Sequence, residues 1–414
     1  MRYNLGYLDQ YSIEAVGTVL ENIPMLKVRF KTPIDPILLE NSVCQALKAY
    51  PLFSTKVMYD KEYYLTDNNN PIVIVHASLH ERPLKFGKST NDYPWQICYD
   101  NNEMTFEWLH GVTDGNGALV FIRMILLAYF GVDGPETKKV YRIAPGLEPF
   151  YDKNEEGEDF PHDPDGFSFK DFPLKKHKGF KADCHFLSAS TAEIVGCARA
   201  CESSVAPLLA VLFSRALKMH LPKNAKNRNV ACNIAVDLRR PLGYETMHNC
   251  VELPRITYLD RHDTMSIKAV AKEYRQRLDT VRRIPNVVRM MTERVNMLKA
   301  IHLVKGKRAV KLVMKIGGIL MQNHDCNFVV TYLGKVDLPK EVLEKVEDIQ
   351  FELIPDFGGG ALGCIDYNGK FNAEICETFA EKGVVEDFIE LSRQIGIHWT
   401  VEDEHEFEQA HFVE

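Results

Sequence analysis

The stretch from residue 104 to 131, MTFEWLHGVTDGNGALVFIRMILLAYFG, constrains the fold most because its hydrophobic period changes within a few residues. Its first five residues alternate apolar and polar side chains, which is the period of a half-buried strand. Three glycines follow at 111, 115 and 117, and a long apolar helix is expected from about Ala118. The stretch predicts a strand, a tight turn and a buried helix, with His110 where the strand ends.

His110, Asp114 and Gly115 form the pattern H-x-x-x-D-G within this turn. A histidine at the mouth of a strand suits a general base, because a rigid element holds its backbone while its side chain reaches a cleft. Asp114 can cap the helix or bind an arginine, and Gly115 permits a backbone turn that other residues resist. A histidine satisfied within the core and a simple N-cap are the alternative, which the motif alone leaves open.

The composition describes a globular chain that can bury a large core. Of 414 residues, 45% are hydrophobic and 26% charged, and this length suits two domains of about 200 residues each. The N-terminus lacks a basic region followed by an apolar core, and Arg123 interrupts the longest apolar run. We therefore expect a cytoplasmic protein without a membrane span.

Ten cysteines are scattered along the chain without a C-x-x-C pair, so buried reduced thiols are expected rather than disulfides. His-x-Cys occurs twice, at His248/Cys250 and His324/Cys326. These four side chains could form a tetrahedral zinc site if the two segments met, although the usual ligand spacings are missing. No metal is assigned.

Strands and helices alternate in both halves of the chain, which predicts a mixed α/β fold. A strand is expected at 25–31, a helix that ends before Pro51, and a hairpin within 62–76 whose turn is a run of asparagines. Residues 144–181 are rich in Pro, Gly and charged side chains and are predicted to be a crossover linker. The expected division is 1–180 and 181–414, with a late hairpin turning at Asn368-Gly369.

The net charge of −7 conceals a basic stretch from residue 268 to 315, which contains fourteen Lys or Arg residues and three acidic residues. A basic amphipathic surface could meet an acidic carrier protein, an anionic membrane or a nucleotide phosphate, or pair with acids elsewhere in the fold. Nucleic acid is a poor fit, because the chain as a whole is acidic and shows no nucleic-acid-binding motif.

Six segments in this order resemble one known group of proteins. They are PIDPILLENSVCQALKAYPLFSTKV, HGVTDG, SSVAPLLAVLFSRALK, NIAVDLRRP, TYLGKVDLP and LGCIDYNGKFN. Together they resemble the chloramphenicol-acetyltransferase-like superfamily of CoA- or carrier-dependent acyltransferases. That group includes the plant BAHD acyltransferases, the alcohol acetyltransferases and the peptide-synthetase condensation domains, which share the HxxxDG motif.

The resemblance implies two similar subdomains in a V, with an active-site tunnel between them. It also implies that His110 takes a proton from a hydroxyl or amine as that group attacks an acyl thioester. Acyl-CoA is then a co-substrate, and no cofactor is bound permanently. A neutral imidazole is an ordinary base for this step near neutral pH.

The resemblance also assigns roles to other residues. Asp114 is expected to turn away from the substrate and pair with Arg239, with Arg240 as the near competitor. Thr331, on the VVTYLG strand, is a candidate donor to the oxyanion or a tunnel contact, although threonine is also common in strands for its β-propensity.

The chain departs from the family in three places. Condensation domains have two adjacent histidines, and here the first is Leu109. Tyr332 stands where relatives often have asparagine, which is expected to alter the acceptor channel. The plant D-F-G-W-G motif is reduced to DFGGG at 356–360 and is not carried over. Three linker lysines could contact CoA phosphates, although a solvated linker is the preferred interpretation: Lys175, Lys176 and Lys178.

The leading functional prediction is a free-standing, monomeric acyltransferase that moves an acyl group from CoA to a small or lipid-like alcohol or amine. One alternative is a condensation-type enzyme whose donor is bound to an acyl carrier protein, which the basic stretch would suit. Another is a catalytically silent binding member of the fold.

Overall fold

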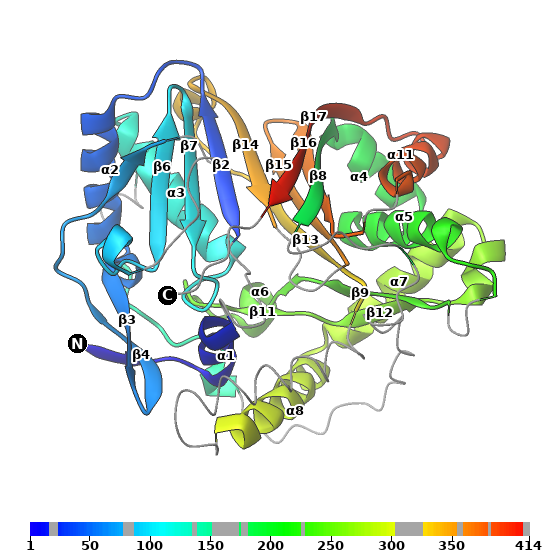
Figure 1. Ribbon diagram of the computed structural model, residues 1–414, viewed down its shortest axis with the longest axis horizontal. Helices are drawn as coiled ribbons and strands as arrows, with labels where there is room; N and C mark the ends of the chain where they lie inside the picture. Colours follow the sequence, from blue (N-terminus) through cyan, green and yellow to red (C-terminus); the bar gives the residue numbers. More distant parts are fainter. Residues whose placement is uncertain are drawn as a thin grey trace.

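The computed structural model describes residues 1–15, 24–77, 87–134, 139–150, 174, 181–224, 228–302, 326–353, 359–379 and 382–408. Two units, each a sheet with helices, lie side by side (Figure 1). Each has its own hydrophobic core. The predicted mixed α/β class and its two subdomains are confirmed.

The first unit is built on a five-stranded sheet of order β14-β2-β7-β6-β5. Helices α2 (Pro36–Ala49) and α3 (Gly115–Tyr129) pack together beside this sheet. A smaller sheet, of order β1-β4-β3, and the N-terminal helix α1 (Tyr7–Ala15) adjoin it. The strand bounds are β1 Arg2–Asn4, β2 Met25–Phe30, β3 Thr55–Asp60, β4 Glu62–Asp67, β5 Ile74–His76, β6 Trp95–Asp100, β7 Glu103–Trp108 and β14 Val346–Glu352.

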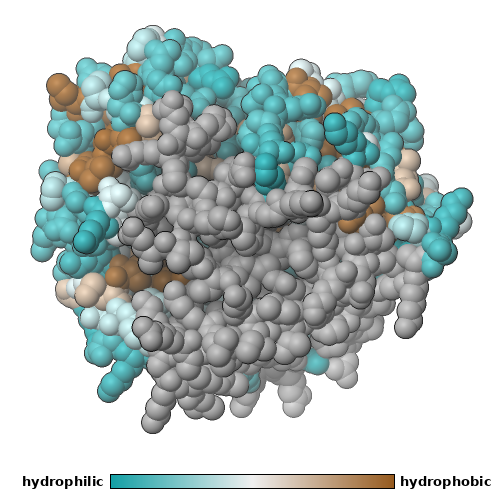
Figure 2. Space-filling view, in the orientation of Figure 1, coloured by the Kyte–Doolittle hydropathy of each residue, from teal (hydrophilic) through white to brown (hydrophobic). Residues whose placement is uncertain are grey.

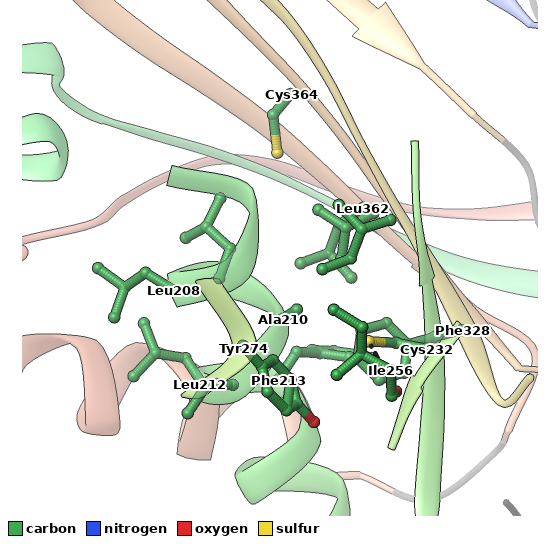
Figure 3. Packing of buried hydrophobic residues seen from close by; sticks show 14 of the residues in the cluster. Leu208, Ala210, Leu212, Phe213, Cys232, Ile256, Tyr274, Phe328, Leu362 and Cys364 are labelled. Carbon is green, nitrogen blue, oxygen red and sulfur yellow. Dashed lines mark hydrogen bonds between the residues drawn. The ribbon is translucent and has the colours of Figure 1, made fainter. Parts of the chain in front are cut away.

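The second unit is built on a seven-stranded sheet of order β12-β9-β13-β15-β16-β8-β17. Figure 3 shows side chains of α5 (Val205–His220) facing those of the sheet, among them Phe213, Phe328 and Leu362. The strand bounds are β8 Lys181–Ser190, β9 Val230–Ile234, β12 Arg255–Tyr258, β13 Phe328–Lys335, β15 Gly360–Tyr367, β16 Lys370–Glu377 and β17 Thr400–Glu408. The helix bounds are α4 Thr191–Ala200, α5 Val205–His220, α7 Ile267–Val281, α8 Ile284–His302 and α11 Val384–Gln394. Short elements join them: β10 Val236–Asp237, α6 Arg239–Leu242, β11 Val251–Glu252 and α10 Lys340–Leu343.

Strand β14 crosses from the second half of the chain into the first sheet. It pairs antiparallel with β2, and its Ile349 and Phe351 belong to the first core. The predicted division at 180/181 falls immediately before β8, which begins at Lys181 and is the first strand of the second sheet along the chain. It does not separate the sheets, because a strand from the second half completes the first one.

Local sequence signals account for several elements. Asp35 caps α2 by accepting from the backbone amides of Ile37 and Leu38, as its short side chain before a helix predicts. The turn at Asn368-Gly369 joins β15 to β16 with positive φ at both residues, which confirms the predicted hairpin. The hairpin expected within 62–76 was wrong, because β4 pairs with β3 and β1 whereas β5 joins β6 in the other sheet.

The expectation of reduced cysteines was wrong for one pair. Cys184 on β8 and Cys376 on β16 are directly opposite in antiparallel register, with Cα atoms 4.2 Å apart, and they form a disulfide. They are separated by 192 residues in sequence, so their pairing follows from strand register, which spacing alone does not reveal.

The described part of the basic stretch lies mainly on α7 and α8. Lys268 and Lys272 both contact Glu202, at 3.1 and 2.6 Å, and Arg275 contacts Asp279 at 2.7 Å. Part of the positive charge is thus paired with acids of the same fold, and residues 303–315 lie outside the described chain. On the face shown in Figure 2, the described surface is mainly hydrophilic with scattered hydrophobic patches.

Within the described residues, no single helix is both long and apolar enough to cross a membrane; α4 and α5 meet those limits only as a pair bent by 83°.

Glu107 is a buried acid on β7, three residues before His110, and only 6% of it is exposed. Its burial, and then the nearby Glu352 carboxylate, raise its pKa from the ordinary value of 4.5 to about 8. The folded protein therefore holds this proton more tightly than the unfolded chain does. Its contribution is most favourable at low pH and is lost as pH rises through about 8.

Replacing Glu107 by glutamine is therefore expected to stabilise the protein in alkali. The expected gain in the free energy of unfolding is on the order of 4 kcal/mol at pH 9 and less than about 1 kcal/mol at pH 5. Thermal unfolding at both pH values, with the exposed Glu40→Gln as control, measures it. A difference that does not change with pH would mean that Glu107 does not hold the proton.

Candidate active site

The predicted strand-turn-helix is present around His110. Strand β7 ends at Trp108, and Asp114 is the N-cap of α3, which begins at Gly115 rather than Ala118. The Asp114 Oδ1 accepts from the Gly117 amide at 2.9 Å. The helix start therefore fixes the end of the turn that carries His110.

Asp114 forms the expected ion pair with Arg239, the first residue of α6. The Arg239 Nη2 donates to Asp114 Oδ1 at 2.9 Å, and the Cys250 amide donates to Asp114 Oδ2 at 2.9 Å. Only 2% of the Asp114 side chain and 16% of the Arg239 side chain are exposed. The pair ties the start of α3 in the first half to the start of α6 in the second.

Arg239 reaches four groups with one guanidinium. Besides Asp114, it donates to the carbonyls of Thr246 and His248, each at 2.8 Å, and to Asp237 Oδ1 at 3.1 Å. Burial alone would lower its pKa, but the Asp114 and Asp237 carboxylates outweigh burial and raise it. A planar fork with several donors suits this position, and Arg239 occupies it rather than Arg240.

Gly115 lies where the two halves touch. A Cβ atom there would be 2.5 Å from Cδ2 of Leu333 on β13, so a larger residue would require the Leu333 side chain to move. Gly115 thus leaves room for the Leu333 side chain against the turn.

His110 is partly buried and is held by Asn249. Its Nδ1 lies 3.0 Å from Asn249 Oδ1, and the Asn249 Nδ2 donates to the His110 carbonyl at 2.6 Å. The same Nδ2 donates to Asp9 Oδ1 at 2.7 Å. Sequence reasoning missed both Asn249 and Asp9, which are 139 and 240 residues from the groups they contact. The local sequence carries no signal for such contacts.

Thr331 lies on β13, two residues before Leu333. Residues at alternate positions of a strand share a face, and Val329 and Leu333 both pack against the first core. Thr331 is therefore on the strand face directed at the first unit. Tyr332 is on the other face, 5.4 Å from the ring of Phe371 in the second core, and its expected effect on an acceptor channel stays a prediction.

The His248/Cys250 pair has a structural place in this site. His248 is 3% exposed, and burial lowers its pKa to about 4, while its carbonyl binds Arg239. Burial likewise raises the pKa of the Cys250 thiol to about 12. His324 lies outside the described residues. Among those described, the three side chains grouped closely enough for a metal are Cys184, Glu374 and Cys376, and the two cysteines are joined in the disulfide.

The other sequence expectations fall on undescribed residues or stay predictions. Lys175, Lys176, Lys178 and most of DFGGG at 356–360 lie outside the described chain. A small cavity near the turn is lined by residues such as Tyr50, Tyr141, Met247 and His248, and His110 is not among them. The tunnel expected at His110 remains a prediction.

No protein-family model matches the chain, and neither does the sequence of any curated protein. Solved structures do match in fold. The trichothecene 15-O-acetyltransferase TRI3 from Fusarium sporotrichioides has a TM-score of 0.62 and 11% identity, covering 95% of each chain.

Two further structures give the same result. TRI101 of F. graminearum, solved with coenzyme A and T-2 mycotoxin, has a TM-score of 0.62 and 12% identity over 96% of this chain and 99% of its own. The condensation domain of the monacolin K polyketide synthase MokA has a TM-score of 0.57 and 10% identity over 95% and 96%. The chain therefore has the two-subdomain fold of these acetyltransferases and of this condensation domain.

Proposed function

We propose that the protein is an acyltransferase that moves an acyl group from a CoA thioester to the hydroxyl of a small or lipid-like alcohol, or to an amine. The observation that carries the proposal is the way the turn is built. The Asp114–Arg239 pair fixes its end, Asn249 holds its histidine, and the whole lies where the two subdomains touch. Structural neighbours solved with coenzyme A support acyl-CoA as the co-substrate.

In the proposed reaction His110 is the general base. Its Nε2 takes the proton of the acceptor hydroxyl while the hydroxyl oxygen bonds to the thioester carbonyl carbon. The tetrahedral intermediate then collapses with cleavage of the carbon–sulfur bond. The leaving thiolate receives the proton from the imidazolium, so free CoA thiol and an ester are formed and the histidine is neutral again. Holding both substrates at one base makes the attack effectively intramolecular.

The negative oxygen of that intermediate needs a hydrogen-bond donor. Thr331 is the candidate on this chain, because its strand face is directed at the first unit and β13 reaches the turn through Leu333 and Gly115. A hydroxyl preorganised there would stabilise charge that develops only during the reaction.

Thiol release from acetyl-CoA and longer acyl-CoAs, measured against a panel of alcohols and amines, tests the proposal. We expect release that depends on the acceptor, with the acylated acceptor identified by mass spectrometry. A folded protein that releases no thiol from any acyl-CoA and acceptor would contradict CoA-dependent transfer.

The same panel with acyl carrier proteins as donors distinguishes the alternatives. Turnover only with carrier-bound acyl groups, weakened by salt, would point to a condensation-type enzyme that uses the positive charge of α7 and α8. Binding of acyl-CoA without turnover from either donor would point to a silent member of the fold.

A further inference from the structure

Asn249 links His110 to a buried carboxylate that the proposed reaction does not use. We propose that Asn249, held by Asp9, is the positioning residue that fixes the ring orientation and the tautomer of His110. This inference rests on the function proposed for His110, and it goes further by naming the residues that leave Nε2 free to act as the base.

The hydrogen bonds determine which way the Asn249 amide faces. One end of the amide lies 2.6 Å from the His110 carbonyl oxygen and 2.7 Å from Asp9 Oδ1. A carbonyl oxygen can only accept a hydrogen bond, so this end must be the NH₂ group. Its two hydrogens satisfy both oxygens. The assignment does not depend on the charge of Asp9, because the backbone carbonyl alone requires it.

The tautomer of His110 follows from that orientation. The Asn249 Oδ1, which can only accept, faces the His110 Nδ1 at 3.0 Å. The Nδ1 must therefore carry the hydrogen, and in a neutral imidazole the Nε2 then keeps its lone pair. Asn249 thus directs the basic nitrogen away from itself. The other tautomer would place two acceptors against each other.

Asp9 is fixed by the packing of α1 against the same turn. A Cβ atom on Gly111, the residue after His110, would be 2.6 Å from the Asp9 carbonyl oxygen and 2.4 Å from Cγ1 of Ile13. Only glycine allows the helix to come so close. Asp9 itself is 4% exposed, so its carboxyl group is an anchor that solvent barely reaches.

Glu148 completes the surroundings of Asp9. A Cβ atom added at Gly146 would be 3.3 Å from the Glu148 Oε2 and 3.3 Å from the Asp9 Oδ2, so the two carboxyl groups flank the same backbone position. Burial, and then the nearby Glu148, raise the pKa of Asp9 well above its ordinary value. The Asn249 amide still faces Asp9 in either protonation state, since the Asp9 oxygen accepts in both.

Nitrogen NMR of histidine-labelled protein tests the inference without any substrate. The His110 signals are assigned by their loss in His110→Gln. We expect the Nδ1–H tautomer in the wild type and a mixture or the Nε2–H tautomer in Asn249→Ala. Asp9→Asn keeps an acceptor for the Asn249 amide and should retain the wild-type signals, whereas Asp9→Ala should not. The exposed Asn41→Ala serves as control, and thermal melts confirm that each variant is folded.

Kinetics separate positioning from a structural role. Asn249→Ala should lower kcat about 10²-fold with little change in KM, because a misplaced base affects the chemical step. Asp9→Asn should restore most of the rate relative to Asp9→Ala. A wild-type Nε2–H tautomer, a tautomer unchanged in Asn249→Ala, or an unchanged kcat in that variant would each overturn the inference. An inactive wild type with the expected spectra would instead contradict the transferase and leave the tautomer assignment standing.

Discussion

Replacing His110 by alanine is expected to lower kcat/KM about 10²–10⁴-fold, the range that a positioned general base contributes. The loss should appear in kcat, because the imidazole acts on a proton that moves only in the transition state. The protein should stay folded. The His110 carbonyl, which Asn249 binds, belongs to the backbone and remains, so the variant loses one side-chain hydrogen bond.

The matched control for this variant is His398→Ala. The His398 side chain is 66% exposed and contacts Glu193 on the surface of the second unit. Its removal should leave both kcat and the thermal midpoint unchanged. Full activity in His110→Ala, with the melt of the wild type, would remove His110 from the mechanism, whereas unfolding of His110→Ala would show a structural histidine.

The second large effect is expected for Asp114→Asn. The substitution removes a carboxylate that is 2% exposed and leaves Arg239 partly buried without its nearest counter-charge. In either orientation of the new amide, its NH₂ group would face a hydrogen-bond donor. That donor is the Cys250 amide in one orientation, and the Gly117 amide and Arg239 in the other. Breaking one side of a buried pair costs about 3–5 kcal/mol. Stability and turnover should therefore fall together, because the same carboxylate fixes the turn.

Asp237→Asn is the internal control, since Asp237 contacts the same guanidinium at 3.1 Å but is 39% exposed. It should cost less than about 1 kcal/mol. Denaturant unfolding of Asp114→Asn, Arg239→Gln and the double variant measures the coupling, with Asp237→Asn measured beside them. The double variant should lose less than the sum of the single losses; strict additivity would show that the two groups do not stabilise each other.

The sequence predicts those parts of the fold that depend on local chemistry. The change of hydrophobic period at His110, the helix that ends before Pro51 and the Asn368-Gly369 hairpin all arise from neighbouring residues, and all are present. The Asp114–Arg239 contact spans 125 residues. It was expected through the resemblance alone, because neither residue has a local pattern that names its partner.

Other features depend on tertiary register and could not be predicted. Strand β14 joins the first sheet from the second half, and the Cys184–Cys376 disulfide needs β8 and β16 in one particular alignment. Asn249 lies between His248 and Cys250, the candidate zinc ligands, and its contacts with His110 and Asp9 require α1 and the turn to lie against it. These contacts are set by the packing of distant segments.

Direct transfer with His110 as base is the central claim, and a rapid-quench single turnover with labelled acyl-CoA tests it most directly. With acceptor present, the label should pass from CoA to the acceptor without accumulating on the protein, and His110→Ala should slow that transfer about 10²–10⁴-fold. Without acceptor, the wild-type protein should carry no covalent label. Label that binds covalently to the protein and is then chased into the acceptor would contradict direct transfer, as would transfer at the wild-type rate in His110→Ala.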